Sequence, residues 1–302
     1  MNKCICRICG SEKTTQIYDQ VSQAPESSVY LCQACGINFI HPIMSQQEED
    51  DFYAESFENY MAQRSGPSWE SPEEHFFAQQ PEGERRLNLV RKYLKRIHSV
   101  LEIGSSTGYF LDDLRGYTAG ITGIEPSGLF REYANSRDIR TVSKIEELTG
   151  QKYDIILMYY VVEHLRDPVG YFSDLKCMLM DGGRILVEVP NVNDALITLY
   201  NAKGFQPFYW QKAHYYNYSH HSLEYVLGKA GYQVSTHPEQ RYDLSNHMNW
   251  LQNGVPGGTG LYSEYFGKEV EVSYAETLKQ NWICDTIFGE ATATDGSHDN
   301  SG

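Results

Sequence analysis

The stretch SVLEIGSSTGYFLDDL, residues 99–114, joins an apolar run to a second apolar pattern through a turn of small residues. The first part predicts a buried strand over 99–104, and the spacing in the last part predicts a helix over 107–116. The Gly-Ser-Ser-Thr-Gly segment (104–108) indicates a strand-to-helix turn, where the backbone can approach a ligand closely. Free N–H groups at the start of the helix would point toward that ligand, so we expect a binding site here.

Composition limits the classes of protein to consider. The chain has 302 residues, of which 41% are hydrophobic, and a formal net charge of -15, which disfavours a nucleic-acid partner. The basic stretch RRLNLVRKYLKR (85–96) has helical spacing, and we expect its charges to form the exposed face of a helix. No segment approaches the roughly 20 apolar residues of a membrane span, and the N-terminus lacks a secretory apolar region. We therefore expect a cytoplasmic protein without a membrane span.

Strand and helix patterns alternate through most of the chain. Strands are predicted at 99–104, 120–125, 139–143, 153–159, 184–189, 232–236 and 282–288, and helices at 85–97, 107–116, 127–137, 168–180 and 222–230. Such alternation indicates βαβ units, so we expect an α/β fold: a Rossmann-like, doubly wound, mostly parallel sheet of seven strands. A small zinc-ribbon-like module is expected in front of it.

The sequence divides into segments of different character. We expect a zinc-binding module at 1–41 and a connecting helical segment at 42–84. The main domain is expected at 85–290, with an insertion rich in Gly, Tyr and Asn at 240–280 that is placed to act as a substrate lid. Residues 291–302 offer little apolar surface to bury and are expected to be a disordered tail.

Two C-x2-C pairs mark the N-terminal module. Cys6 and Cys9 lie in CRICG, Cys32 and Cys35 lie in CQACG, and 22 residues separate the pairs. Glycine after the second cysteine permits the tight turn that brings both thiolates to one tetrahedral ion, and zinc fits this donor set. The alternative is a set of reduced thiols or disulfides, and Cys4 is an ambiguous fifth member. Four sulfurs would fill the coordination shell, so the module is expected to be structural or to shape a substrate site.

Two acids accompany the glycine turn. Gly104 and Gly108 alone are a weak signal, because GSSTG lacks the three-glycine dinucleotide fingerprint. Glu125 ends the second predicted strand, 21 residues after Gly104, where an acid can accept the hydroxyls of a ribose. Glu102 is unusual in an NAD site and suits a ligand with a cationic amine. The alternative is that both are solvated acids at strand ends.

Taken together, four segments resemble the class I S-adenosylmethionine-dependent methyltransferases over about residues 85–235. They are LEIGSSTG (101–108), GIEPSG (123–128), YDIILMYYVVEHLRDP (153–168) and LMDGGRILVEVPN (179–191). Ser106 replaces the middle glycine of that family's loop, and a residue this small still allows close backbone approach. The cysteine module and QRYDLSNHMNWLQNGVPGG (240–258) resemble bacterial methyltransferases of sugar, polysaccharide or secondary-metabolite biosynthesis.

The resemblance implies which residues contact S-adenosylmethionine: Glu102, Gly104, Ser105, Gly108, Tyr109, Glu125, Pro126 and Tyr159. Glu102 would lie near the methionine amine and Glu125 would hold the ribose. Two histidines are candidates for the catalytic base. His164 follows the fourth strand, and His214 lies in the aromatic segment after the fifth. The alternatives are that His164 orients its loop and that His214 is a coincidental surface residue.

The activity most consistent with these patterns is O-methylation of a sugar or of a polysaccharide or secondary-metabolite precursor. C- or N-methylation of a nucleotide sugar or another small molecule is the first alternative, since all use this fold. An NAD-dependent oxidoreductase and a non-catalytic binding module are alternatives of other classes. The expected cofactors are S-adenosylmethionine and zinc, and the expected partner is a small molecule or glycan precursor. The oligomeric state is open, with a homodimer among the options.

Overall fold

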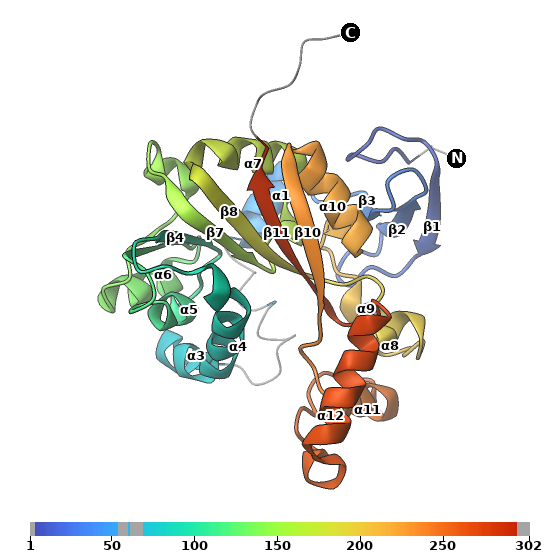
Figure 1. The fold of residues 1–302 in the computed structure, drawn as a ribbon. Coiled ribbons are helices and arrows are strands. Elements are labelled where there is room, and N and C mark those ends of the chain that lie inside the picture. The colour runs from blue at the N-terminus through green and yellow to red at the C-terminus, as the bar shows by residue number, and fades with distance from the viewer. Residues whose placement is uncertain (1–3, 54–59, 61–68, 295–302) are drawn as a thin grey trace.

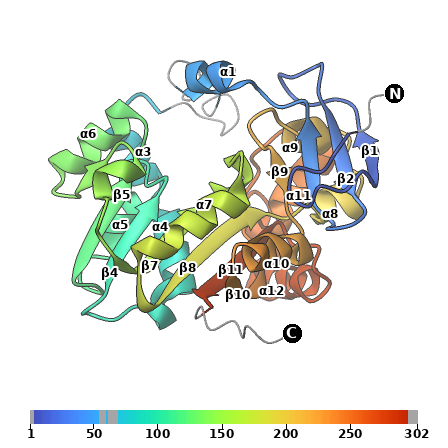
Figure 2. The same ribbon diagram turned by 90° about the horizontal axis from the view of Figure 1, so that it is seen from above.

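The computed structural model describes residues 4–53, 60 and 69–294 and contains two β-sheets (Figures 1 and 2). The larger sheet has the strand order β10-β11-β8-β7-β4-β5-β6. Its strands are β4 (Ser99–Ile103), β5 (Gly120–Ile124), β6 (Thr141–Val142), β7 (Tyr153–Tyr159), β8 (Leu179–Pro190), β10 (Tyr232–Glu239) and β11 (Thr286–Ala293).

Strand directions confirm the mostly parallel arrangement. β4 pairs in parallel with β5 and β7, β5 with β6, and β7 with β8. Only β11 runs the other way within this sheet, because it pairs antiparallel with both β8 and β10. The seven-stranded, Rossmann-like sheet expected from the sequence is therefore present, and the carboxyl ends of its parallel strands meet at one edge.

Apolar side chains alternate between the two faces of the sheet. Val100 and Leu157 belong to a buried cluster that includes residues of α4 (Gln80–Val90) and α5 (Tyr109–Asp113). Leu101 and Met158 belong to one that includes residues of α7 (Pro168–Leu175) and α10 (His220–Lys229). Successive side chains of a strand point to opposite faces, so a strand buried on both sides is apolar throughout. Figure 2 shows these helices around the sheet.

The helices are mostly short. They are α1 (Gln46–Asp51), α3 (Pro72–Ala78), α4 (Gln80–Val90), α5 (Tyr109–Asp113), α6 (Gly128–Ser136), α7 (Pro168–Leu175), α8 (Ala195–Thr198), α9 (Phe205–Tyr209), α10 (His220–Lys229), α11 (Leu244–Asn253) and α12 (Ser263–Gln280). Single 3-10 turns are η2 (Arg91–Tyr93), η3 (Ile145–Leu148), η4 (Val162–His164) and η5 (Lys176–Met178). None of the described helices is long and apolar enough to cross a membrane.

The second sheet joins the N-terminal module to a distant part of the chain. Its order is β1 (Thr14–Tyr18), β2 (Ser28–Cys32), β3 (Asn38–His41) and β9 (Tyr216–Asn217). All its pairs are antiparallel, and in the last of them Phe39 lies opposite Tyr216, both fully buried. The module is therefore completed by a strand that lies far beyond residue 41.

Two sequence expectations near the C-terminus are corrected. The last strand is Thr286–Ala293, not 282–288, because its apolar residues Ile287 and Ala291 are buried between two other strands. The disordered tail expected from residue 291 is therefore wrong for 291–293, whereas 295–302 lie outside the described residues. The segment expected as an insertion at 240–280 contains α11 and α12, which project from one end of the sheet in Figure 1.

Deletion of residues 1–41 tests how strongly the module and the main domain depend on each other. Deletion would remove the contacts of Tyr215 and Tyr216 with Ile40 and Phe39 and expose these two fully buried rings, and we expect the Tm to fall by at least about 5 °C. Thermal unfolding followed by circular dichroism measures this. An unchanged Tm would show that the module is an independent appendage.

Candidate active site

The turn after β4 contains three residues with positive φ, a backbone conformation that small residues such as glycine favour. Gly104 and Gly108 both have φ of 77°, and Ser106 has φ of 52°. A side chain at Gly104 would place its Cβ 2.7 Å from a methyl group of Val161, so only glycine fits without displacement. The N–H groups of Gly104 and Ser105 both donate to the carbonyl of Ile124, at 2.9 and 3.0 Å. The turn is thereby fixed to the end of β5.

Glu125 links the loops that follow β4 and β5. Its carboxylate accepts hydrogen bonds from the backbone N–H groups of Ser106 at 2.7 Å and Ser127 at 2.8 Å. The side chain is half-buried. Pro126, the next residue, has its carbonyl bonded to Arg131 at 2.9 Å. An acid is therefore held at the carboxyl edge of the sheet, beside the glycine turn.

Glu102 is a buried acid with an incomplete set of partners. Only 1% of its surface is exposed, and its Oε1 lies 3.4 Å from Nη1 of Arg86. Its Oε2 has no hydrogen-bond partner among the described residues. Burial raises the pKa of Glu102 to about 8, although the Arg86 guanidinium opposes that rise. A cationic group would satisfy the free oxygen.

Arg86 is a site residue that sequence reasoning missed. The basic residues of 85–96 were expected on an exposed helix face, but Arg86 is only 7% exposed. Its guanidinium carbon lies 4.2 Å from the ring centre of Tyr159 and 5.3 Å from that of Tyr109. The expectation is wrong for this residue because α4 packs against α5 and turns Arg86 toward the buried acid of β4.

Further charges of α4 pair with other elements near the same edge. Nη2 of Arg85 lies 2.7 Å from the carboxylate of Glu188, which β8 supplies and which is fully buried. Nε of Arg241 lies 3.3 Å from the carboxylate of Glu82. Arg241 belongs to the segment before α11, so this ion pair connects that segment to α4.

The two candidate histidines lie side by side. The ring centres of His164 and His214 are 4.9 Å apart, and the rings are nearly perpendicular. Nδ1 of His164 is 2.8 Å from the carbonyl oxygen of Ala213. Because a carbonyl only accepts, Nδ1 carries the proton and Nε2 keeps a lone pair. Burial lowers the pKa of His164 to about 4, so the ring is neutral at pH 7.

Glu163 adjoins this pair and was not among the residues singled out from the sequence. It is 1% exposed, and neither carboxylate oxygen accepts a hydrogen bond from another described residue. Burial raises the pKa of Glu163 to about 8, and the negative charge of Glu188 contributes in the same direction. Its position beside His164 in the sequence is the one signal that could have identified it.

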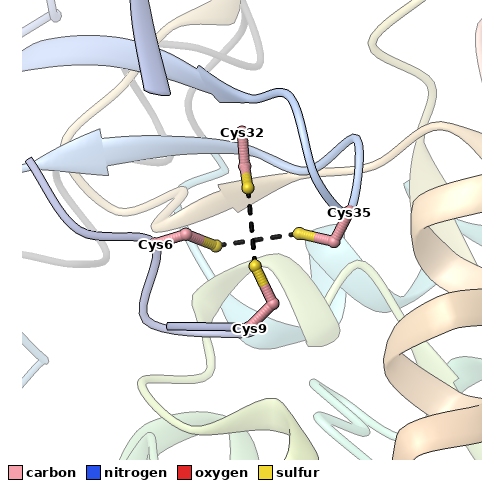
Figure 3. Close-up of side chains that lie close together, drawn as sticks. All are labelled: Cys6, Cys9, Cys32 and Cys35. Carbon is pink, nitrogen blue, oxygen red and sulfur yellow. Dashed lines mark hydrogen bonds between the residues drawn. The ribbon is translucent and has the colours of Figure 1, made fainter. Parts of the chain in front are cut away.

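The cysteines of the N-terminal module converge on one point (Figure 3). The sulfurs of Cys6 and Cys35 are 3.7 Å apart, those of Cys9 and Cys32 are 3.5 Å apart, and all four lie within 4.8 Å of one another. None of them forms a disulfide. A hydrogen bond with Cys35 lowers the pKa of the Cys6 thiol to about 5, so a thiolate is stabilised there. This donor set fits a tetrahedral zinc ion.

A family described as a methyltransferase domain matches residues 74–237, more than half of the chain, and the chain belongs to this family. It is an S-adenosylmethionine-dependent methyltransferase. The match spans β4, the glycine turn, both histidines and most of β10. The prediction of enzyme class and of S-adenosylmethionine as cofactor is thus confirmed.

Curated relatives are distant. A tRNA U34 carboxymethyltransferase of Dichelobacter nodosus is 26% identical over 113 residues, which are 34% of this chain and 36% of that protein. The chain thus spans about a third of that relative's length. A ubiquinone biosynthesis O-methyltransferase of Rhizobium leguminosarum bv. trifolii is 27% identical over 188 residues, covering 57% of this chain and 71% of that one.

Solved structures agree on the fold. An S-adenosylmethionine-dependent methyltransferase from Archaeoglobus fulgidus is 18% identical, with a TM-score of 0.50, over 72% of this chain and 96% of that one. The magnesium protoporphyrin IX methyltransferase of Synechocystis PCC 6803, with bound S-adenosylhomocysteine, is 13% identical, with a TM-score of 0.50. The match covers 81% of this chain and 97% of that one. At these identities the likeness concerns the fold alone.

Proposed function

We propose that this methyltransferase methylates a hydroxyl oxygen of a small molecule, with a sugar or a polysaccharide or secondary-metabolite precursor as the acceptor. The observation that carries the cofactor part is the unpartnered, buried oxygen of Glu102, two residues before the glycine turn. A carboxylate there supports binding of an amino-acid ammonium group. S-adenosylmethionine supplies a methyl group on a positively charged sulfur, and the protein must align it with the acceptor.

The cofactor would be held by the residues named from the sequence: Glu102, Gly104, Ser105, Gly108, Tyr109, Glu125, Pro126 and Tyr159. Glu102 receives the ammonium group, and the turn that follows it lines the methionine portion. Glu125, whose carboxylate is fixed by two backbone N–H groups, would accept hydrogen bonds from the ribose hydroxyls. Arg86 packs on both tyrosine rings and so keeps them beside Glu102.

The acceptor would lie near His164 and His214, at the end of β7. A hydroxyl must lose its proton as it is methylated, and an imidazole with a lone pair, such as that of neutral His164, can accept it. Burial raises the pKa of Tyr209 and of Tyr218, and the nearby Glu163 carboxylate adds to this rise, so both phenols are neutral near Glu163. Their rings suit the apolar face of a sugar. These observations support O-methylation more than C- or N-methylation.

Two alternatives have less support. An NAD-dependent oxidoreductase is disfavoured by membership of the methyltransferase family and by Glu102. A tRNA acceptor, as the names of some relatives suggest, is disfavoured by the net charge of -15. Release of S-adenosylhomocysteine in the presence of nucleotide sugars, phenols or tRNA distinguishes these acceptors.

We propose zinc as the ion of the Cys6, Cys9, Cys32 and Cys35 cluster. The turns that carry these thiols are closed by backbone hydrogen bonds from Gly10 to Cys6 and from Gly36 to Cys32, at 2.8 and 2.9 Å. Both glycines have positive φ, of 75° and 72°. Four sulfurs complete the shell, so the ion would stabilise the module and take no part in methyl transfer.

Replacing Glu125 tests the ribose contact. Because Glu125→Ala removes the acid that would hold both hydroxyls, S-adenosylhomocysteine should bind at least about tenfold more weakly, the loss of a charge-assisted hydrogen bond. Isothermal titration measures this, with NAD as a control ligand that should not bind the wild type. An unchanged affinity would falsify the assignment of Glu125, and binding of NAD alone would favour the oxidoreductase.

The raised pKa of Glu102 predicts a pH-dependent affinity. With a pKa of about 8 the free side chain is mostly protonated near neutral pH, whereas pairing with an ammonium group requires the ionised form. Affinity for S-adenosylhomocysteine should therefore rise about tenfold from about pH 6 to about pH 7. This is the largest change per pH unit that binding can show when it requires the loss of one proton. Glu102→Gln should remove the slope. A flat wild-type profile would contradict the proposed contact.

Metal analysis tests the zinc proposal. Purified protein should contain about one zinc per chain in the cysteine cluster, and Cys9→Ser combined with Cys32→Ser should lose it and lower the Tm. Cys177→Ser is the matched control, because Cys177 is exposed and far from the cluster in sequence. Fully folded wild-type protein that contains no zinc would contradict the proposal and show that the module folds without a metal ion.

A further inference from the structure

Glu163, His164 and His214 form a compact group outside the cysteine cluster. One nitrogen or oxygen atom from each lies within 4.8 Å of the other two. Glu163 and His164 belong to η4 directly after β7, and His214 lies two residues before β9. Two separate parts of the chain therefore bring three metal-binding side chains together at the carboxyl edge of the sheet.

The Glu163 carboxylate has no counter-ion in the described part of the chain. Neither of its oxygens has an ion pair or a hydrogen bond with another described residue. The charged group that interacts with Glu163 is another acid, Glu188, and the other titratable groups nearby are the tyrosines Tyr209 and Tyr218. The hydroxyl of Tyr209 is likewise buried without a partner, and that of Tyr218 donates to the carbonyl of Val162 at 3.4 Å. A carboxylate so placed is costly unless a positive charge joins it.

The two histidines are oriented by contacts with neighbouring residues. The Ala213 carbonyl fixes the proton of His164 on Nδ1, so Nε2 has a free lone pair. The side-chain amide nitrogen of Gln211 lies 3.4 Å from Nδ1 of His214 and can only donate, so Nδ1 is the acceptor of this contact. The carbonyl oxygen of Gln211 accepts a hydrogen bond from Tyr60. In metal-ligating histidines the other ring nitrogen usually donates to a carbonyl or a carboxylate, as Nδ1 of His164 does to Ala213.

We propose that Glu163, His164 and His214 bind a divalent metal ion, of the Mn²⁺, Fe²⁺ or Zn²⁺ type. One carboxylate and two imidazoles are a donor set that these ions accept. Ligands about 2.1 Å from one ion lie roughly 3 Å apart, so small side-chain rotations would close the group around it. Three protein ligands leave coordination positions open, unlike the four sulfurs of the cysteine cluster.

The open positions give this site a role in the reaction, and this step rests on the proposed function. An acceptor hydroxyl bound there would release its proton to solvent more readily, because the ion stabilises the negative oxygen. His164 and His214 would then be ligands and would not themselves take the proton. Metal binding itself depends on neither the acceptor nor the cofactor.

Titration with Mn²⁺, followed by the electron paramagnetic resonance signal of free Mn²⁺, tests the site in the full-length protein. We expect one Mn²⁺ per chain in the wild type and at least about tenfold weaker binding in Glu163→Gln and in His214→Asn. His221→Asn is the matched control, because His221 is exposed, and should bind as the wild type does. Zinc content and Tm, measured on each variant, show that the cysteine cluster and the fold persist.

Two results would overturn the metal site: no Mn²⁺ binding by the wild type, or unchanged affinity in Glu163→Gln. Titration of the same samples with S-adenosylhomocysteine separates this outcome from failure of the proposed function. Wild-type protein that binds S-adenosylhomocysteine but no Mn²⁺ would refute the metal site alone. Protein that binds Mn²⁺ through Glu163 but no S-adenosylhomocysteine would support the metal site and contradict the cofactor assignments.

Discussion

The junction between the ends of β4 and β5 is the constraint on which the rest of the site depends. One carbonyl, that of Ile124, accepts hydrogen bonds from the N–H groups of both Gly104 and Ser105. The side-chain carboxylate of the next residue, Glu125, accepts hydrogen bonds from the backbone N–H groups of Ser106, in the loop after β4, and Ser127, in the loop after β5. Because the two bonds to the Ile124 carbonyl join backbone groups only, they hold the turn independently of side-chain rotamers. A ligand therefore meets a surface that is ordered before it binds, which lowers the entropic cost of binding.

The N-terminal module has a second consequence for the site. The segment that carries His214 runs along this module. Ser22 and Gln211 form an isolated bridge, the N–H of Ile40 donates to the carbonyl of Tyr215 at 3.0 Å, and Phe39 pairs with Tyr216. The loop that holds His214 is therefore fixed by the strands of the N-terminal module. The cysteine cluster holds the turns of that module together. A structural ion in the module would thus also help to order a histidine in the candidate site.

The sequence predicted the core better than the site. Residues 155–158 of β7 are continuously apolar because both faces of the strand are buried, and a pattern of this kind does not depend on distant contacts. Arg86 could not be identified, because helical spacing places it among basic residues and its burial depends on packing against α5. Strand β9 has only two residues, too few for a periodic signal. The burial of Glu163 likewise depends on the tertiary fold, which brings Tyr209 and Tyr218 near it from far away in the sequence.

Three buried acids near one edge of the sheet differ in how their charge is balanced, and the difference supports the proposed positions of the ligands. Glu188 is fully paired, because Arg85 contacts one oxygen and Thr286 donates to the other at 3.0 Å. Glu102 is half paired, with Arg86 at one oxygen only. Glu163 is unpaired among the described residues. Since a buried charge without a partner is strongly unfavourable, the two incomplete acids are the positions where a bound cation would gain most. One lies beside the glycine turn, where an ammonium group fits, and the other lies beside two histidines, where a metal ion fits.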